Sequence, residues 1–277
     1  MHTDNNTKYS VLMSVYYREK PGNLREAMDS IWNQSIETDD FVLVCDGPLT
    51  PELDSVIEEM EKKHYPILKV IRLDENMGLG NALNVGIQEC KNNLIARMDS
   101  DDISRPNRCE KELMVFRNNP DISIVSGTVE EFDDSIDNID AKRVLPTDHN
   151  SIVKFAKRRN PFNHPCVMYK KSAVDLAGGY KDFFLLEDYY LWIRMLESGS
   201  IGHNLEEPLL WMRAGADMYK RRSGSKYARS QKLLFKYMMD TGFISKKEYY
   251  SNITIRFISS LMPNGLREIA FKTILRK

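Results

Sequence analysis

The sequence is poor in cysteine and lacks any long apolar segment. Only four of its 277 residues are cysteines, and no two of them form a Cys-x-x-Cys pair. This spacing argues against a zinc site or a disulfide framework and fits a reducing compartment. No apolar run approaches the ~18 residues of a transmembrane helix, and the first eight residues are polar, so we expect no membrane span and no signal peptide. The expected location is the cytoplasm.

The chain also lacks a strong net charge, but its charges are unevenly distributed. The formal net charge is −1, whereas residues 213–277 contain 15 Lys or Arg and only 4 Asp or Glu. An acidic body with a basic C-terminal part favours an anionic partner for that part. We expect no nucleic-acid partner, and the sequence does not predict an oligomeric state.

Strands and helices alternate in the first half of the chain. Apolar runs typical of buried strands lie at 9–15, 41–45, 67–73 and 93–98. Apolar residues at helical spacing predict helices around 24–31, 53–60 and 80–90. This alternation predicts an α/β fold with a mostly parallel central sheet flanked by helices. Ligands bind beyond the carboxyl ends of such strands, where this chain has polar clusters at 14–16, 46–47, 74–76 and 99–102.

The second half of the chain is less regular. We expect strands at 122–132 and 164–169, an acidic loop or hairpin at 131–143, and an amphipathic helix at 185–198. Residues from Ser223 onward have helical patterns with a break around 263–265. We therefore expect one domain at 1–222, with halves at about 8–105 and 106–222, and a basic amphipathic helical extension at 223–277.

Three carboxylates follow the fourth predicted strand, in the segment RMDSDDISRP. Asp99, Asp101 and Asp102 repel one another unless a cation lies among them, and oxygen ligands of this kind suit Mg²⁺ or Mn²⁺. The alternative is a solvated acidic turn or a cap for the next helix. An EF-hand loop would need glycine where this segment has Ser104, and a phosphatase of the haloacid type would need an aspartate nucleophile where Val44 stands.

Six motifs occur in a characteristic order: YSVLMSVYYRE, VCDGP, NMGLGNALNVGI, RMDSDDISRPNR, NPFNHPCVMY and LLEDYYLWIRM. Together they resemble the inverting GT-A glycosyltransferases of family 2 that build bacterial capsule, exopolysaccharide and O-antigen, over roughly residues 8–222. The resemblance implies a GT-A fold and metal-dependent transfer of a sugar from a UDP-sugar to a lipid-linked glycan acceptor. The alternatives are a sugar-1-phosphate nucleotidyltransferase, whose glycine-rich, lysine-bearing loop is poorly matched here, and a nucleotide-sugar-binding module without turnover.

The resemblance assigns roles to residues at the strand ends. Ser14 and Tyr16 would line the nucleotide pocket, and Asp46 would accept a hydrogen bond from uracil. Asn76 would belong to a loop near the nucleotide, and Asp99 would lie on the ribose side. The alternatives are an ordinary turn at 46–48 and an ordinary helix entry at 76–80.

The same resemblance places the metal and the general base. Asp101 would be the principal metal ligand, with Asp99 and Asp102 in support, although Asp102 is also a candidate helix cap. Glu187 and Asp188 match the acidic pair of the family, in which Asp188 would take the proton of the acceptor hydroxyl. An aspartate at a helix start is also an ordinary cap.

Two further positions concern the donor sugar. His164 would form a wall of the sugar pocket, or it packs at the start of a strand. Cys166 stands where the family often has Ser or Thr, which leaves the donor sugar open.

Many relatives have a histidine after this helix that adds a metal ligand, but the corresponding segment here, WMRAGADMYKRR at 211–222, contains none. Basic residues of this segment would instead bind the diphosphate from a closing loop, because guanidinium groups pair with phosphates. They are Arg213, Lys220, Arg221 and Arg222, and Gly215 and Gly224 would let the loop move. The alternative is a solvated basic loop.

Residues 246–277 contain seven basic and two acidic residues, interleaved with apolar side chains. This pattern suits an amphipathic helix on an anionic bilayer, at ~1 kcal/mol per basic residue near the surface. A helix pair packed on the catalytic domain, or a dimer contact, fits equally well. A lipid-linked acceptor would make peripheral contact with the cytoplasmic face of the inner membrane useful.

Overall fold

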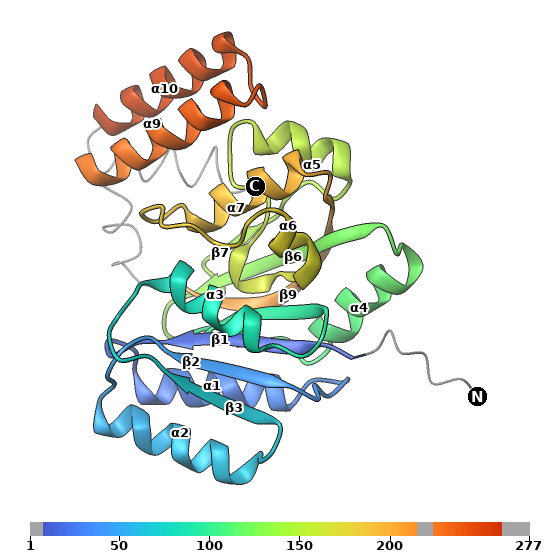
Figure 1. Ribbon diagram of the computed structural model, residues 1–277, viewed down its shortest axis with the longest axis vertical. Coiled ribbons are helices and arrows are strands. Elements are labelled where there is room, and N and C mark those ends of the chain that lie inside the picture. Colours follow the sequence, from blue (N-terminus) through green and yellow to red (C-terminus); the bar gives the residue numbers. More distant parts are fainter. Residues whose placement is uncertain (1–7, 215–223, 262–277) are drawn as a thin grey trace.

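The computed structural model describes residues 8–214 and 224–261, with no side chains described at 257–261. Within these ranges, nine strands form one mixed sheet in the order β3-β2-β1-β4-β8-β6-β9-β5, with β7 paired to β6 (Figure 1). The strands are β1 (Ser10–Val15), β2 (Phe41–Cys45), β3 (Leu68–Arg72), β4 (Leu94–Asp99), β5 (Ile103–Ser104), β6 (Ile122–Phe132), β7 (Ala141–Arg143), β8 (Met168–Lys170) and β9 (Ile201–Arg213). The helices are α1 (Pro21–Trp32), α2 (Pro51–Lys63), α3 (Leu79–Glu89), α4 (Arg108–Asn118), α5 (His149–Ala156), α6 (Lys171–Leu176), α7 (Glu187–Glu197), α9 (Ser225–Asp240) and α10 (Lys246–Leu261).

The four strands predicted in the first half are confirmed, and they pair in parallel. β1 lies between β2 and β4, and β3 continues the sheet beyond β2. In this register Ser14 pairs with Val44 on one side and with Asp99 on the other. Because parallel strands end at the same edge of a sheet, the polar clusters that follow these strands lie along one edge.

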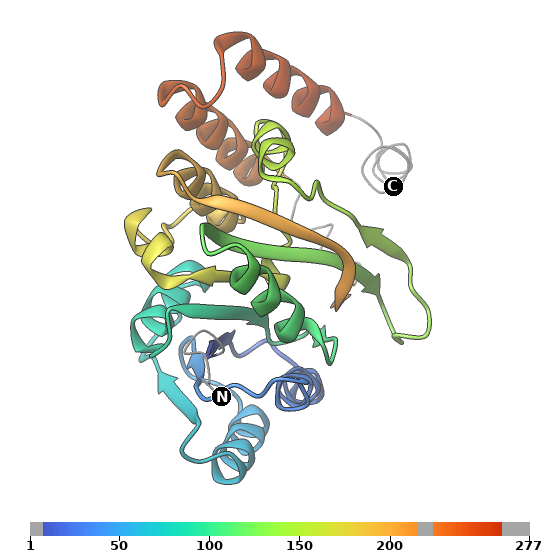
Figure 2. The ribbon, with the colours of Figure 1, turned by 90° about the vertical axis from the view of Figure 1, so that its right-hand side faces the viewer.

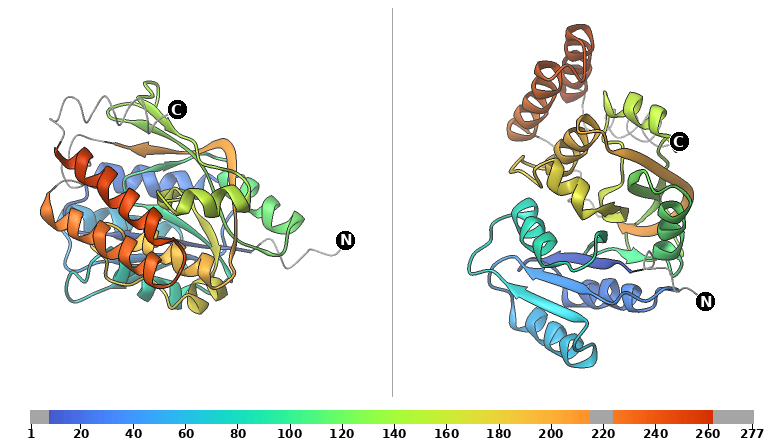
Figure 3. Two further views of the ribbon diagram at one scale, coloured as in Figure 1. Left: turned by 90° about the horizontal axis from the view of Figure 1, so that it is seen from above. Right: turned by 45° about the vertical axis from the view of Figure 1, so that its right-hand side comes forward.

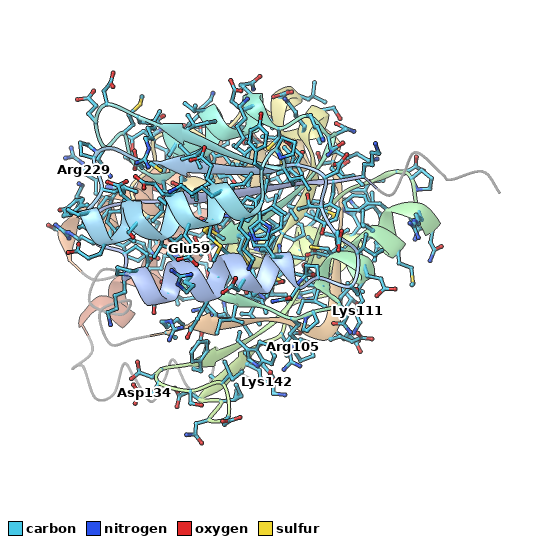
Figure 4. The ribbon with its side chains drawn as sticks, turned by 90° about the horizontal axis from the view of Figure 1, so that it is seen from below. Glu59, Arg105, Lys111, Asp134, Lys142 and Arg229 are labelled. Carbon is cyan, nitrogen blue, oxygen red and sulfur yellow. The ribbon has the colours of Figure 1, made fainter. Side chains whose placement is uncertain are left out.

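Both faces of this parallel half are covered by helices, as predicted. Along β1, Val11 and Met13 pack in a hydrophobic cluster with α1, α2 and α4. Leu12, which points to the opposite face, packs with α3, α6 and α7. The alternation follows from the two-residue period of a strand. In Figure 4 α1 and α2 lie side by side, and Glu59 of α2 accepts two hydrogen bonds from Arg25 of α1.

Helix α3 approaches the sheet closely because it carries Gly86. A Cβ atom at this position would lie 2.3 Å from Leu12 Cδ1 and 2.8 Å from Val44 Cγ2. The glycine therefore lets the helix backbone rest on β1 and β2.

The second half of the sheet is mixed and is built on β6 and β9, which run side by side in parallel over most of their length (Figure 2). The strand at 122–132 and the hairpin formed by β6 and β7 are confirmed. Strand β9 was not predicted, because two glutamates and Pro208 interrupt its apolar pattern. Its register with β6 shifts on both sides of Thr128, as at a β-bulge.

The strand expected at 164–169 is only partly correct. Residues His164–Cys166 form a 3₁₀ turn, and the strand β8 begins at Met168. Pro165 explains the difference, because it has no N–H to donate to a strand ladder, and the N–H of Cys166 instead donates to the carbonyl of Asn163.

The C-terminal helices α9 and α10 form a pair that packs on the body of the molecule (Figure 3). Leu234, Phe235 and Met238 of α9 share a hydrophobic cluster with Tyr189 and Ile193 of α7. Of the expected arrangements, packing on the catalytic domain is therefore present for this pair. The helix break expected at 263–265 and the rest of the basic tail lie outside the described residues. Within the described ranges, no helix combines the length and the hydropathy needed to cross a bilayer.

Candidate active site

The three clustered aspartates lie where β4 ends and the chain turns toward β5. Asp99, Asp101 and Asp102 each offer a carboxylate oxygen, and these oxygens lie within 4.8 Å of one another. Burial, followed by repulsion from Asp99 and Glu19, raises the pKa of Asp101 to about 7. Burial, followed by repulsion from Asp101 and Asp99, raises the pKa of Asp102 well above its usual range. The ionised forms of these three carboxyl groups therefore repel one another, and a nearby positive charge would stabilise them.

One buried cation already lies beside the cluster. The Arg97 side chain is 1% exposed, and its Nη2 donates to Asp99 Oδ1 at 2.5 Å. Burial alone would lower the pKa of Arg97, but the Asp99 carboxylate raises it. The charge of Arg97 also favours the ionised forms of Asp101, Asp102 and Glu187. Arg97 therefore forms an ion pair with one of the three acids, Asp99.

Arg213, the last residue of β9, contacts the aspartate cluster. The backbone N–H of Arg213 donates to Asp102 Oδ1 at 2.8 Å, and Arg213 Nε donates to the carbonyl of Asp101 at 3.1 Å. The guanidinium also pairs with Glu26 of α1 at 2.8 Å and stacks on the Phe132 ring. Arg213 therefore ties the aspartate turn to α1 and β6 and holds positive charge at the rim of the site. Lys220, Arg221, Arg222 and Gly215 lie outside the described residues, whereas Gly224 has a φ of 93° before α9.

Asp46 lies at the end of β2 and organises the loop that leads into α3. Its two carboxylate oxygens accept hydrogen bonds from the backbone N–H groups of Met77 at 2.7 Å and Gly78 at 3.1 Å. In return, Asn76 Nδ2 donates to the carbonyl of Asp46 at 3.1 Å. Gly47 has a φ of 84°, and a Cβ atom there would lie 2.6 Å from the Asn76 nitrogen. Asp46 and Asn76 are thus brought together, with Asp46 nearly buried and Asn76 exposed.

The end of β1 supplies the next part of the same edge. Ser14 is half-buried beside Asp99, and Tyr16 is half-buried two residues further on. The ring of Tyr16 meets that of Tyr17 edge-on, with centroids 5.8 Å apart. Glu19 follows, and it accepts a hydrogen bond from Ser100 Oγ at 3.1 Å. Sequence reasoning missed Glu19, because a lone glutamate before a helix carries no distinguishing signal.

The acidic pair lies at the start of α7. Leu185 has a φ of 58°, the one positive φ outside glycine in the described ranges, and such strained backbone is often found at functional sites. Burial, followed by repulsion from Asp188, raises the pKa of Glu187 to about 7, and Asp99 adds to this shift. A Cβ atom on Gly80, in the first turn of α3, would lie 3.6 Å from Glu187 Cβ, so the acidic pair begins next to the start of α3.

Asp188 accepts two short hydrogen bonds. Its Oδ1 accepts from the backbone N–H of Tyr189 at 2.6 Å, and its Oδ2 accepts from Asn160 Nδ2 at 2.6 Å. Both donors stabilise the ionised carboxylate. Asn160 was also missed, because an asparagine in a loop before proline is an ordinary turn residue and its contact spans distant parts of the chain.

His164 and Cys166 lie deeper in the molecule. His164 Nε2 lies 2.9 Å from the Tyr180 hydroxyl, and its ring meets Trp192 edge-on. Burial, followed by the charge of Arg97, lowers the pKa of His164 well below its usual range. Cys166 is fully buried, and burial raises the pKa of its thiol. The packed alternative for His164 matches these contacts better than a wall exposed to a sugar.

The site therefore combines a trio of carboxylates suited to a divalent cation with a second acidic pair suited to proton transfer. Comparisons with known proteins agree with this chemistry. The model of the family "Glycosyl transferase family 2" matches residues 10–175. An uncharacterized glycosyltransferase of Haemophilus influenzae is 41% identical over 270 residues, covering 98% of this chain and 100% of the relative.

Two further relatives have more specific names. The UDP-Gal:alpha-D-GlcNAc-diphosphoundecaprenol beta-1,3-galactosyltransferase of Escherichia coli is 38% identical over 275 residues, covering 99% of both chains. The amylovoran biosynthesis glycosyltransferase AmsE of Erwinia amylovora is 38% identical over 267 residues, covering 95% of this chain and 98% of the relative.

Solved structures show the same fold at low sequence identity. The mannosyltransferase PcManGT of Pyrobaculum calidifontis, in complex with GDP-Man and Mn²⁺, has a TM-score of 0.65 at 14% identity, over 89% of this chain and 68% of its own. TarS of Staphylococcus aureus (residues 1–349) in complex with UDP-GlcNAc has a TM-score of 0.65 at 15% identity, over 96% of this chain and 73% of its own. The chain therefore belongs to glycosyl transferase family 2 and is a glycosyltransferase with the GT-A fold.

Proposed function

We propose that the enzyme transfers a sugar from a UDP-sugar to a lipid-linked glycan during the synthesis of a bacterial surface polysaccharide, with inversion at the anomeric carbon. The observation that carries the proposal is the cluster of three aspartates after β4, with Glu187 packed beside the start of α3. Two relatives of nearly the same length support the substrate classes, because one is named for UDP-Gal and a diphosphoundecaprenol acceptor and the other for amylovoran synthesis.

The residues present fit a divalent cation. Three carboxylates offer oxygens that lie within 4.8 Å of one another, and Mg²⁺ and Mn²⁺ prefer oxygen ligands. Burial, followed by repulsion among the carboxylates, raises the pKa values of Asp101 and Asp102, and a cation would relieve the repulsion. We assign Asp101 as the principal ligand, with Asp99 and Asp102 in support. When bound, such an ion supplies positive charge for the diphosphate leaving group.

The nucleotide would lie along the ends of β1, β2 and β4. Asp46 uses two of its roughly four acceptor sites for the loop before α3, and a remaining site would accept the N–H of uracil. Tyr16 would pack against the base, with Ser14 and Asn76 lining the pocket. Asp99, fixed by Arg97, would face the ribose. Arg213, which donates to the carbonyl of Asp101, would attract the diphosphate.

The proposed reaction is a single displacement in which Asp188 acts as the general base. The acceptor hydroxyl oxygen forms a bond to the anomeric carbon while the carbon–oxygen bond to UDP breaks, and its electron pair leaves with UDP. Asp188 takes the hydroxyl proton at the same time. Glu187 lies beside the base, and burial together with repulsion from Asp188 raises its pKa to about 7.

Membrane contact would suit a lipid-linked acceptor, and the exposed side chains of α9 support it. Arg229, Lys232 and Lys236 lie on the exposed face of α9, and Leu233 on the same face is 52% exposed. The pair packs on α7, which carries the proposed base. We propose that this face docks on anionic lipid at the cytoplasmic side of the inner membrane.

Replacement of Asp188 by Asn tests the proposed function. Loss of a general base should lower kcat by about 10²–10⁴, whereas the affinity for UDP measured by calorimetry should stay within twofold. A panel of UDP-, GDP- and dTDP-sugars, scored for transfer and thermal stabilisation, tests the donor class, with UDP-galactose as the first donor. Unchanged turnover in D188N would exclude this base, and stabilisation by a GDP-sugar alone would exclude uridine.

A further inference from the structure

Asn160 makes a direct contact with the proposed base from a separate part of the chain. It lies in the loop after α5, and its Nδ2 donates to Asp188 Oδ2 at 2.6 Å. The other oxygen of Asp188 accepts from the Tyr189 backbone. The carboxylate is thus held by a hydrogen bond at each of its two oxygens.

The orientation of the Asn160 amide is fixed by its own surroundings. Its Oδ1 accepts a hydrogen bond from the backbone N–H of Phe162 at 3.4 Å, so its NH₂ group is the one that faces Asp188. Phe162 is buried and packs edge-on against Trp192 of α7 at 5.8 Å. Asn204 Nδ2 also donates to the carbonyl of Pro161 at 3.0 Å. The donor is therefore held in place before any substrate binds.

The hydrogen bond is not needed to join the two segments. Tyr189 of α7 donates its hydroxyl proton to the carbonyl of Ala156 at 2.6 Å, and the contact of Phe162 with Trp192 adds a second connection. A purely structural role for Asn160 would duplicate these contacts. Its distinctive feature is a neutral donor aimed at a carboxylate, which stabilises the anion and fixes its plane without the full charge of a Lys or Arg.

We propose that Asn160 is a positioning residue, whose amide holds the Asp188 carboxylate ionised and oriented toward the acceptor hydroxyl. The proposal rests on the proposed function, because it gives Asp188 the role of base. Precise placement of a base matters, because a shift of about 1 Å can cost 10²-fold in rate. Asn160 acts through Asp188 and need not touch the substrate.

The test combines Asn160→Ala, Asn160→Asp and the double variant N160A/D188N, with N150A on the exposed part of α5 as the matched control. Turnover is followed as UDP release from the fastest donor among UDP-galactose, UDP-glucose and UDP-GlcNAc. N160A should lower kcat about 10–100-fold, with KM for the donor and affinity for UDP within twofold. N160D, which places an oxygen where the NH₂ was, should lower kcat at least as much, and N150A should change nothing.

The double variant N160A/D188N distinguishes a positioning role of Asn160 from a purely structural one. In the D188N background, N160A should change the residual rate less than twofold, because its target is gone. An equal loss in both backgrounds, or a raised KM with a lowered melting temperature in both N160A and N160D, would overturn the proposal. If D188N alone keeps full activity, the base assignment fails, and an N160A defect in that case shows a separate role for Asn160.

Discussion

Replacement of Asp46 by Asn tests whether this carboxylate both holds the loop before α3 and accepts a hydrogen bond from the uracil base. The change keeps the shape of the side chain but replaces one oxygen with an NH₂ group. Asp46 now accepts from two backbone N–H groups, one on each oxygen, at 2.7 and 3.1 Å. Asparagine can accept only one of these, so the other N–H is left facing a second donor in a nearly buried site.

The magnitude follows from these two bonds. A hydrogen bond to a charged group contributes about 1.5–3 kcal/mol, and an unsatisfied buried group costs about 1–3 kcal/mol. We therefore expect the free energy of unfolding to fall by about 2 kcal/mol in urea denaturation. If the same carboxylate also accepts the uracil N–H, affinity for UDP should fall by a similar free energy, which is roughly 30-fold.

The control is Asp74→Asn, which makes the same chemical change at an exposed position near the same loop. D74N should alter neither the free energy of unfolding nor the affinity for UDP measured by calorimetry. Loss of stability in D46N with unchanged UDP affinity would reduce Asp46 to a loop anchor and refute the uridine assignment. Unchanged values for both quantities would refute the whole reasoning.

Three further predictions concern other parts of the molecule. Gly47→Ala should lower the free energy of unfolding by about 2–3 kcal/mol, because it combines a left-handed φ with a Cβ only 2.6 Å from the Asn76 nitrogen. The control is G22A, at a glycine with open space around it. Equal free energies of unfolding for the two variants would contradict the argument. Arg97→Met should lower the free energy of unfolding by about 2–4 kcal/mol, which is less than the loss of a fully buried ion pair because Asp99 is 32% exposed. Addition of Mn²⁺ with UDP should restore part of this loss, measured by thermal unfolding. R229E/K232E should lower the affinity for anionic vesicles, measured by co-sedimentation, at least tenfold relative to K62E/K63E on α2, at about 1 kcal/mol per charge. Equal affinities would exclude the α9 face as the membrane-docking surface.

The parallel half of the fold could be predicted because its strands and helices each have a recognisable pattern in the local sequence. Strands buried on both faces are continuous apolar runs, and the helices between them show their core-facing residues at helical spacing. The placement of the aspartate cluster follows from the parallel order, since all such strands end at one edge. The pairing of Arg97 with Asp99 fits the two-residue period of a strand, which puts both side chains on the same face of β4.

The missed features depend on contacts between distant segments. Strand β9 is stabilised by β6 despite Glu206, Glu207 and Pro208, whose pattern favours a loop. Asn160 meets Asp188 only because α5 and α7 pack together. Similarly, Arg213 was expected to act from a loop, whereas it ends a strand and is held by Asp101 and Glu26. None of these pairings has a signature in the local sequence.

The central claim is that the clustered aspartates hold a divalent ion that anchors the diphosphate of the nucleotide. Calorimetric titration of UDP, with and without Mn²⁺, into the wild-type enzyme and the Asp101→Asn variant tests it most directly. We expect Mn²⁺ to strengthen UDP binding at least tenfold in the wild type and less than twofold in D101N. UDP affinity that is the same with and without Mn²⁺ in the wild type, or an undiminished Mn²⁺ effect in D101N, would contradict the account.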